Sequence, residues 1–152
     1  MSPMPRAKAP LPPPPATPDE IEQQFYEALQ RADLEQLMAV WSDDDDIVCV
    51  HPGGPRVVGL AAIRSTFEQI FANGAIAAAP EKVRRLQTLD CAVHSVLERI
   101  EVMTDEGPRA AWVLATNVYV KTGLGWRMAA HHASPGTSND VQEIVEAAST
   151  LH

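Results

Sequence analysis

Histidine residues stand at the ends of two strand-like segments of this chain. His51 ends one apolar run and is followed by the chain-breaking Pro52, and a second run ends on the adjacent pair His131 and His132. Histidine has an unperturbed pKa of about 6.5, so its ring exchanges protons near neutral pH, and the neutral ring can ligate a metal. A fold that brings these strand ends together would create a site for acid–base chemistry.

The first of these histidines is the stronger catalytic candidate. Alternation along a strand places His51 on the same face as Ile47 and Cys49. If that face lines the interior, His51 is expected to act as a general base or to hydrogen-bond a ligand. The alternative is a structural histidine that is satisfied by the loop 52–54.

The two adjacent histidines point to opposite faces of their strand, so at most one of them serves an interior site. Strand parity groups His132 with Trp126 and Met128, which form the more apolar set. We therefore expect His132 to face inward as an acid or orienting group. The alternative is a structural role for both histidines.

Aromatic side chains and one amide are candidates for lining a ligand cavity, because such cavities are mostly apolar with a few convergent polar groups. The alternative for each aromatic residue is ordinary core packing. For the amide, which lies among apolar strand residues and needs partners if buried, it is a role in fixing the neighbouring chain. The candidates are Trp41, Phe67, Phe71, Trp112, Tyr119 and Asn117.

Neither a metal nor another cofactor is expected. His94 and the other histidines lack the HxH or HxxxH spacing of metal ligands, and the acidic run 43–46 is typical of a solvated turn. Cys49 and Cys91 lack CxxC spacing and lie in strand-like contexts, which indicates buried, reduced thiols.

The hydrophobic periodicity places helices before strands. Thr17 and Pro18 are typical of a helix start, and the spacing predicts a first helix to Ala32, a short second helix over 34–41 and a third over 60–71. A short strand is predicted over 47–51, between the second and third helices. Long strands are predicted over 83–91, 92–103, 109–121 and 125–134. This order predicts an α+β domain in which a strongly curved antiparallel sheet has its concave face covered by the N-terminal helices.

The chain has 152 residues and a formal net charge of -8. We expect a proline-rich tail over 1–16, one domain over 17–136, and a helix or tail over 137–152. Without a basic cluster, an apolar membrane span or a signal sequence, neither nucleic acid nor a membrane is an expected partner, and a cytoplasmic location is the default. The two longest strands carry apolar residues at both parities, which predicts a homodimer through the outer sheet face.

Several motifs of this chain, and their order along the sequence, resemble the SnoaL-like branch of the nuclear transport factor two superfamily, which also contains ketosteroid isomerases. These motifs include the segments 32–34 and 41–44, His51 with its Pro-Gly-Gly turn, Gly59 at a helix start, 116–119, and 125–135. The resemblance covers residues 17–136. It implies a cone-shaped, cystatin-like roll with an internal pocket, usually paired as a dimer.

The resemblance also implies roles for particular residues. The base position of the isomerases corresponds to His51, and their helix-borne pocket tyrosine corresponds to Phe25, with Tyr26 beside it as a ligand-binding candidate. The expected function is therefore binding of a small apolar or amphipathic molecule, with acid–base catalysis of an isomerase, cyclase or dehydratase type. The alternative is a non-catalytic dimerisation or protein-association module.

Overall fold

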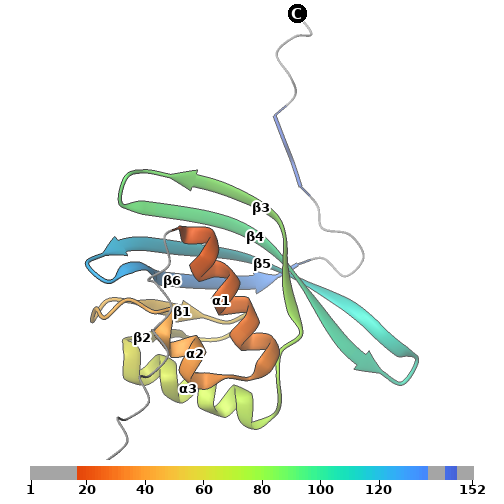
Figure 1. Ribbon diagram of the computed structural model, residues 1–152. Coiled ribbons are helices and arrows are strands. Elements are labelled where there is room, and N and C mark those ends of the chain that lie inside the picture. Colours follow the sequence, from red (N-terminus) through yellow and green to blue (C-terminus); the bar gives the residue numbers. More distant parts are fainter. Residues whose placement is uncertain (1–16, 137–142, 147–152) are drawn as a thin grey trace, which may run out of the picture.

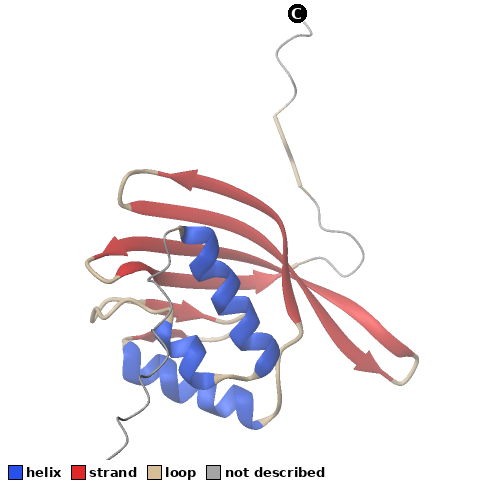
Figure 2. Cartoon of the chain, viewed as in Figure 1, coloured by secondary structure: helices blue, strands red, loops and turns tan. Residues whose placement is uncertain are grey.

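The computed structural model describes residues 17–136 and 143–146. It confirms the predicted α+β class, with three helices lying on one side of a curved six-stranded sheet (Figures 1 and 2). The elements in chain order are α1 (Pro18–Arg31), α2 (Leu34–Ala39), β1 (Val48–Val50), β2 (Arg56–Val58), α3 (Leu60–Ala72), β3 (Ala78–Gln87), β4 (Cys91–Thr104), β5 (Gly107–Thr122) and β6 (Gly125–Pro135).

Helix α1 supplies much of the helical surface that packs on the sheet. It begins as predicted, since the Thr17 side chain accepts a hydrogen bond from the backbone N–H of Glu20 and Pro18 occupies the first turn. Ile21, Phe25 and other apolar residues along one stripe are buried. Helical spacing therefore directs one face of α1 into the core, as amphipathic periodicity requires.

The sheet is mixed rather than wholly antiparallel, in the order β2-β1-β6-β5-β4-β3. Among the described strands, four of the five pairings are antiparallel, and β1 pairs with β6 in parallel. Most of the domain separates these two strands in the chain, so no tight turn dictates their relative direction. This parallel pairing places the end of β1 beside the middle of β6, which brings the two histidine-bearing segments together.

The turn after β1 fixes the position of His51. Beyond it, β2 runs antiparallel to β1 and pairs with it at three positions. The sequence did not predict β2. Gly53 has a φ of 73°, and the backbone N–H of Gly54 donates to the His51 carbonyl at 2.8 Å. Glycine adopts such a positive φ without steric cost, so the Pro-Gly-Gly motif suits this turn.

A bulge in β6 reverses the predicted orientation of the two adjacent histidines. Tyr119 pairs with Met128 and Val118 pairs with Ala130, so one residue of β6, Ala129, is left without a partner on β5. An extra residue of this kind shifts every following side chain to the other face. As a result His131 is buried and His132 is exposed, and the expectation that His132 faces inward is wrong.

Strand β3 begins at Ala78, earlier than predicted, and contains a bulge where Lys82 has a φ of 46°. The predicted C-terminal helix lies mostly outside the described residues, and residues 143–146 are not helical. Glu143 forms an ion pair with Arg84 of β3. None of the helices in the described part of the chain is long and apolar enough to cross a membrane.

Candidate functional site

A set of buried polar side chains links helix α1 to the concave face of the sheet. We call it the buried polar network. Its members come from α1, from inward-facing positions of β4 and β5, and from β6 beyond the bulge, and all are buried. They are Glu22, Tyr26, His94, Glu98, Asn117, Tyr119 and His131.

Asn117 is the centre of this network. Its Nδ2 donates to the Tyr26 hydroxyl at 3.0 Å and lies 3.4 Å from Oε2 of Glu22, so its Oδ1 must be the acceptor for Nδ1 of His131, at 2.5 Å. This arrangement assigns the Nδ1–H tautomer to His131. The Nε2 atom of His131 is therefore an acceptor, and it lies 3.9 Å from Oε2 of Glu98.

The two carboxylates of the network occupy separate branches. Glu98 accepts a hydrogen bond of 2.7 Å from the Tyr26 hydroxyl. Oε2 of Glu22 accepts from the Tyr119 hydroxyl at 2.6 Å and lies 2.8 Å from Nδ1 of His94. Tyr26 and Asn117 thus connect a branch that ends at Glu98 and His131 with a branch that ends at Glu22 and His94.

The Glu98 branch opens into a small internal cavity of about 80 Å³, which we call the inner cavity. Three titratable side chains, His51, Glu98 and His131, lie in its otherwise mostly apolar wall. Exposed Pro52 also lies in the wall, which places the mouth at the turn after β1. The apolar lining comes from Phe25, Leu29, Phe67, Ile76, Ala78, Ile100, Val113 and Ala133.

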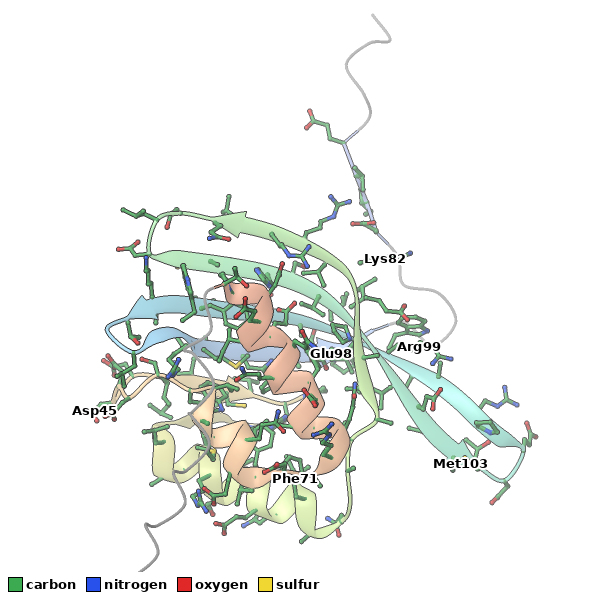
Figure 3. All side chains as sticks on the ribbon, viewed as in Figure 1. Asp45, Phe71, Lys82, Glu98, Arg99 and Met103 are labelled. Carbon is green, nitrogen blue, oxygen red and sulfur yellow. The ribbon has the colours of Figure 1, made fainter. Side chains whose placement is uncertain are left out.

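Burial changes the ionisation of the groups around this cavity. It raises the pKa of Glu98 to about 7, because the charged carboxylate loses its hydration, and the nearby Glu22 acts in the same direction. Burial also lowers the pKa of His131 to about 3, with further repulsion from His51 and His132. Glu98 therefore exchanges its proton near neutral pH, whereas His131 stays neutral and serves as a fixed acceptor. Glu98 of β4 contacts Tyr26 of α1, and Figure 3 labels its position beside that helix.

His51 lies on the predicted face of β1, with Ile47 and Cys49. Its ring packs edge-on against Phe67 at 5.1 Å and lies 6.2 Å from the ring of His131. Burial lowers the pKa of His51, so the ring is neutral at pH 7 and can accept a proton. Cys49 lies 3.7 Å from Nε2 of His51, but burial raises the pKa of its thiol to about 12, which excludes it as a thiolate nucleophile.

The other residues proposed from the sequence divide between the cavity, the network and the remaining structure. Phe67 lines the inner cavity, and Tyr26 and Asn117 reach it through Glu98 and His131. Phe71 packs behind Phe67 at 5.8 Å. The last three are Trp41, which is buried in the core, Tyr119, which bonds Glu22, and Trp112, which faces the opposite side of the sheet from Val113.

Sequence reasoning missed both carboxylates of the network. Glu98 follows Val96 and precedes Ile100 at the same strand parity, so a charged group on the inward face was visible in the alternation. Glu22 lies between Ile21 and Phe25 on the helical stripe, which is a comparable signal. Charged residues at buried positions often mark functional sites.

Comparison with known proteins assigns this chain to a family. Residues 19–138 match the SnoaL-like domain, and the chain therefore belongs to the SnoaL-like family. Among curated proteins, none matches this chain.

Solved structures give the same assignment. A protein of Thiobacillus denitrificans, provisionally assigned as a calcium/calmodulin-dependent protein kinase type II association domain, is 36% identical, with a TM-score of 0.74 over 83% of this chain and 100% of that chain. A provisionally assigned dehydratase of the NTF2-like family from Streptomyces avermitilis is 30% identical, with a TM-score of 0.69 over 78% of this chain and 94% of that chain. The S. rosetta CaMKII hub, at 21% identity, 80% and 99% coverage and a TM-score of 0.64, shares the fold.

Proposed function

We propose that this SnoaL-like domain binds a small, largely apolar molecule in the inner cavity and performs acid–base chemistry on it. The observation that carries the proposal is the convergence of His51, Glu98 and His131 on one mostly apolar cavity. A few polar groups in an apolar, concave site are typical of small-molecule recognition. The reaction class is proton transfer, as in isomerisation, cyclisation or dehydration.

The size of the cavity limits what it holds. A volume of about 80 Å³ is several times the roughly 10–15 Å³ that a cavity needs to hold one water molecule, so it accommodates a group of only a few non-hydrogen atoms. We infer that the reacting head of the ligand enters past Pro52 and that any larger remainder stays at the mouth. A head with a hydroxyl or carbonyl group matches the donor and acceptor chemistry of Glu98 and His131.

The ionisation of the groups supports distinct roles. His51, neutral at pH 7, is placed to take a proton from the ligand. Glu98, whose pKa of about 7 keeps much of it protonated at neutral pH, is placed to supply one. His131 would orient the ligand through its Nε2. His132 is left out of this proposal because it is exposed on the opposite face.

The direct test is native mass spectrometry of the gently purified protein. A retained small molecule would support the proposal and identify the ligand class. The matched variant is Phe67→Trp, which fills the cavity without removing a titratable group, and it should lose the bound mass. A ligand that remains bound to Phe67→Trp would contradict the assignment to the inner cavity.

Replacing His51 with asparagine should weaken ligand binding or turnover while leaving stability nearly unchanged. Positioned acid–base groups contribute about 100- to 10,000-fold to a rate, and His51 forms part of the cavity wall at its mouth. Thermal melts and binding measurements on His51→Asn and wild type would separate the two effects. A lower melting temperature with intact binding would show that the residue is structural.

A second candidate function, a protein-association module, is favoured by the outer face of the sheet. Leu97 lies opposite Leu114, and Val93 lies opposite Val118, on the side of the sheet away from the helices. Leu114 is 41% exposed. A sheet face that stays in water usually carries polar residues, so we propose that a second copy of the chain covers it. The similarity to a protein provisionally assigned as an association domain supports this proposal.

Substituting Leu114 with glutamate should convert the proposed homodimer into a monomer, because a charge would then be buried in an apolar interface. Gln69→Glu, on the exposed face of α3, introduces the same charge elsewhere and should leave the dimer intact. Sedimentation velocity at micromolar concentration measures both. A monomeric wild-type protein would refute the dimer.

We also propose a cytoplasmic location for the protein.

A further inference from the structure

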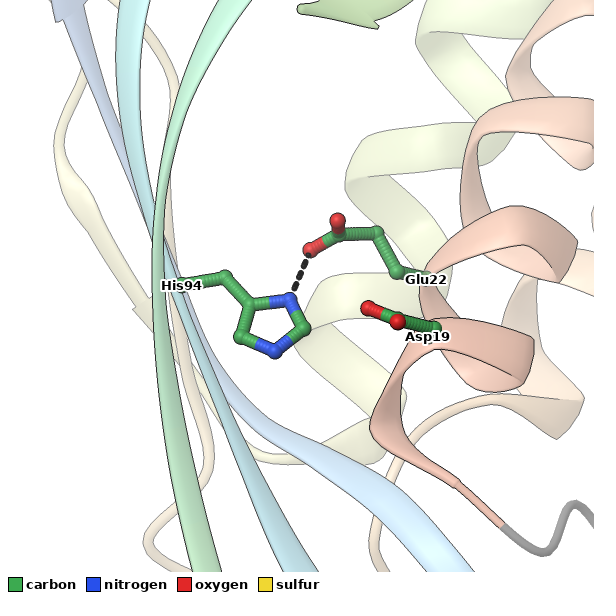
Figure 4. A group of neighbouring side chains, drawn as sticks. All are labelled: Asp19, Glu22 and His94. Carbon is green, nitrogen blue, oxygen red and sulfur yellow. Dashed lines mark hydrogen bonds and ion pairs between the residues drawn. The ribbon is translucent and has the colours of Figure 1, made fainter. Parts of the chain in front are cut away.

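Three potential metal ligands converge where the first turn of α1 faces strand β4. Asp19 and Glu22 are three residues apart on α1, a spacing that puts both carboxylates on one side of a helix. His94 projects toward them from β4, as Figure 4 shows. One ligand atom from each of the three residues lies within 4.8 Å of the other two.

His94 has an unused nitrogen in the protein interior. The residue is 0% exposed, and its Nδ1 lies 2.8 Å from Oε2 of Glu22. Its Nε2 has no hydrogen-bond partner among the described residues. A buried polar atom without a partner costs about 1–3 kcal/mol. Nδ1 is the nitrogen that faces Glu22, and Nε2 lies on the other side of the ring, so an ion shared with Glu22 would bind Nδ1.

Glu22 is a buried carboxylate without a full cationic partner. Its hydrogen bonds from Tyr119 and Asn117 and its contact with His94 all end on Oε2, which leaves Oε1 for another ligand. Among the described residues, no lysine or arginine forms an ion pair with it. Buried charges are normally paired or coordinate a metal, and a cation beside Glu22 would meet that requirement.

A route for a hydrated ion is present. Asp19 and Glu22 both lie in the wall of an open groove of about 620 Å³ that runs between α1 and β3. Asp19 is exposed, and its Oδ1 accepts a hydrogen bond of 2.7 Å from Nε of Arg85, so its other oxygen is available. Arg85 lies in the wall of the same groove and competes with a cation for Asp19.

We propose that Asp19, Glu22 and His94 bind a divalent transition-metal ion, and that zinc matches this set of ligands. Zinc binds histidine nitrogen and carboxylate oxygen at about 2.0–2.2 Å, so two ligands of one ion lie at most about 4.4 Å apart. The three ligand atoms lie within 4.8 Å of one another, so binding would require a small adjustment, which the exposed Asp19 side chain can supply by rotating. Water from the groove completes the coordination. The acidic run 43–46 takes no part in this site.

Zinc titration of the full-length protein, after dialysis against EDTA, tests the site. We expect zinc to raise the melting temperature and to release heat in calorimetry with one ion per chain. Cobalt as a probe should give the visible absorption of a nitrogen- and oxygen-ligated ion. Calcium, which prefers six or more oxygen ligands, should have little effect.

Two surface variants should change zinc affinity in opposite directions. Asp19→Asn should weaken binding roughly 10-fold or more, since even outer partners of a metal contribute that much. Arg85→Gln should strengthen binding because it frees Asp19. Arg84→Gln removes the neighbouring arginine, which pairs with Glu143 instead, and should leave the affinity unchanged. All three side chains are exposed, so these variants should fold.

Two results would overturn the proposal. A wild-type protein whose melting temperature and calorimetric heat do not respond to zinc has no such site. Zinc binding that is insensitive to Asp19→Asn and Arg85→Gln would place the metal elsewhere on the chain. His94→Gln should also abolish binding, and if that variant does not fold, the opposed effects of the two surface variants decide the matter.

Discussion

Replacing Glu98 with glutamine should stabilise the protein at pH 8 by about 3 kcal/mol more than it does at pH 4.5. Burial raises the pKa of this carboxyl to about 7 in the folded protein, whereas the unfolded chain ionises it near its ordinary value of 4.5. Between these values the unfolded state binds fewer protons, so wild-type stability falls by about 1.4 kcal/mol for each pH unit. Glutamine never ionises and still accepts the hydrogen bond from Tyr26.

The comparison must be made between the two proteins at each pH. His131, whose pKa is lowered to about 3, stabilises the fold above about pH 6.5 and loses that contribution as the pH falls, which offsets the Glu98 effect in the wild type. Urea unfolding of both proteins at the same pH measures the difference between their unfolding free energies, and the His131 contribution cancels from that difference. Glu101→Gln, at an exposed position of the same strand, is the control. A Glu98→Gln difference that does not vary with pH would contradict the buried ionisation.

Asn117→Ala should cost about 3 kcal/mol or more of unfolding free energy. The amide is fully buried and holds the Tyr26 hydroxyl, Glu22 and His131, so its removal leaves several buried groups without a partner at about 1–3 kcal/mol each. Chemical denaturation measures the loss. Thr116→Ala, at the neighbouring exposed position, should cost far less. A loss below about 1 kcal/mol for Asn117→Ala would show that the amide does not hold the network together.

Local sequence signals predicted the helices and the long strands well. Thr17 and Pro18 mark the start of α1, and the alternation in β1 correctly placed His51 with Cys49. These features depend on neighbouring residues, which periodicity and capping describe. The small size of the inner cavity, in contrast, depends on side chains from both ends of the chain.

The errors at the candidate site have a common physical origin. The bulge at Ala129 changes strand parity by one residue, and only the pairing with β5 reveals it, so His132 was preferred over His131. The association of Glu22 with His94 joins residues 72 positions apart. The ligands of the proposed metal site therefore carry no short spacing that a sequence motif would capture.

The bulge decides which histidine of the pair belongs to which surface. Adjacent strand residues point to opposite faces, so His131 lies in the cavity wall and His132 lies on the outer surface of the sheet, one peptide unit away. If a second copy of the chain covers the outer face, a ligand beside His131 and the partner chain would contact neighbouring residues of the same strand.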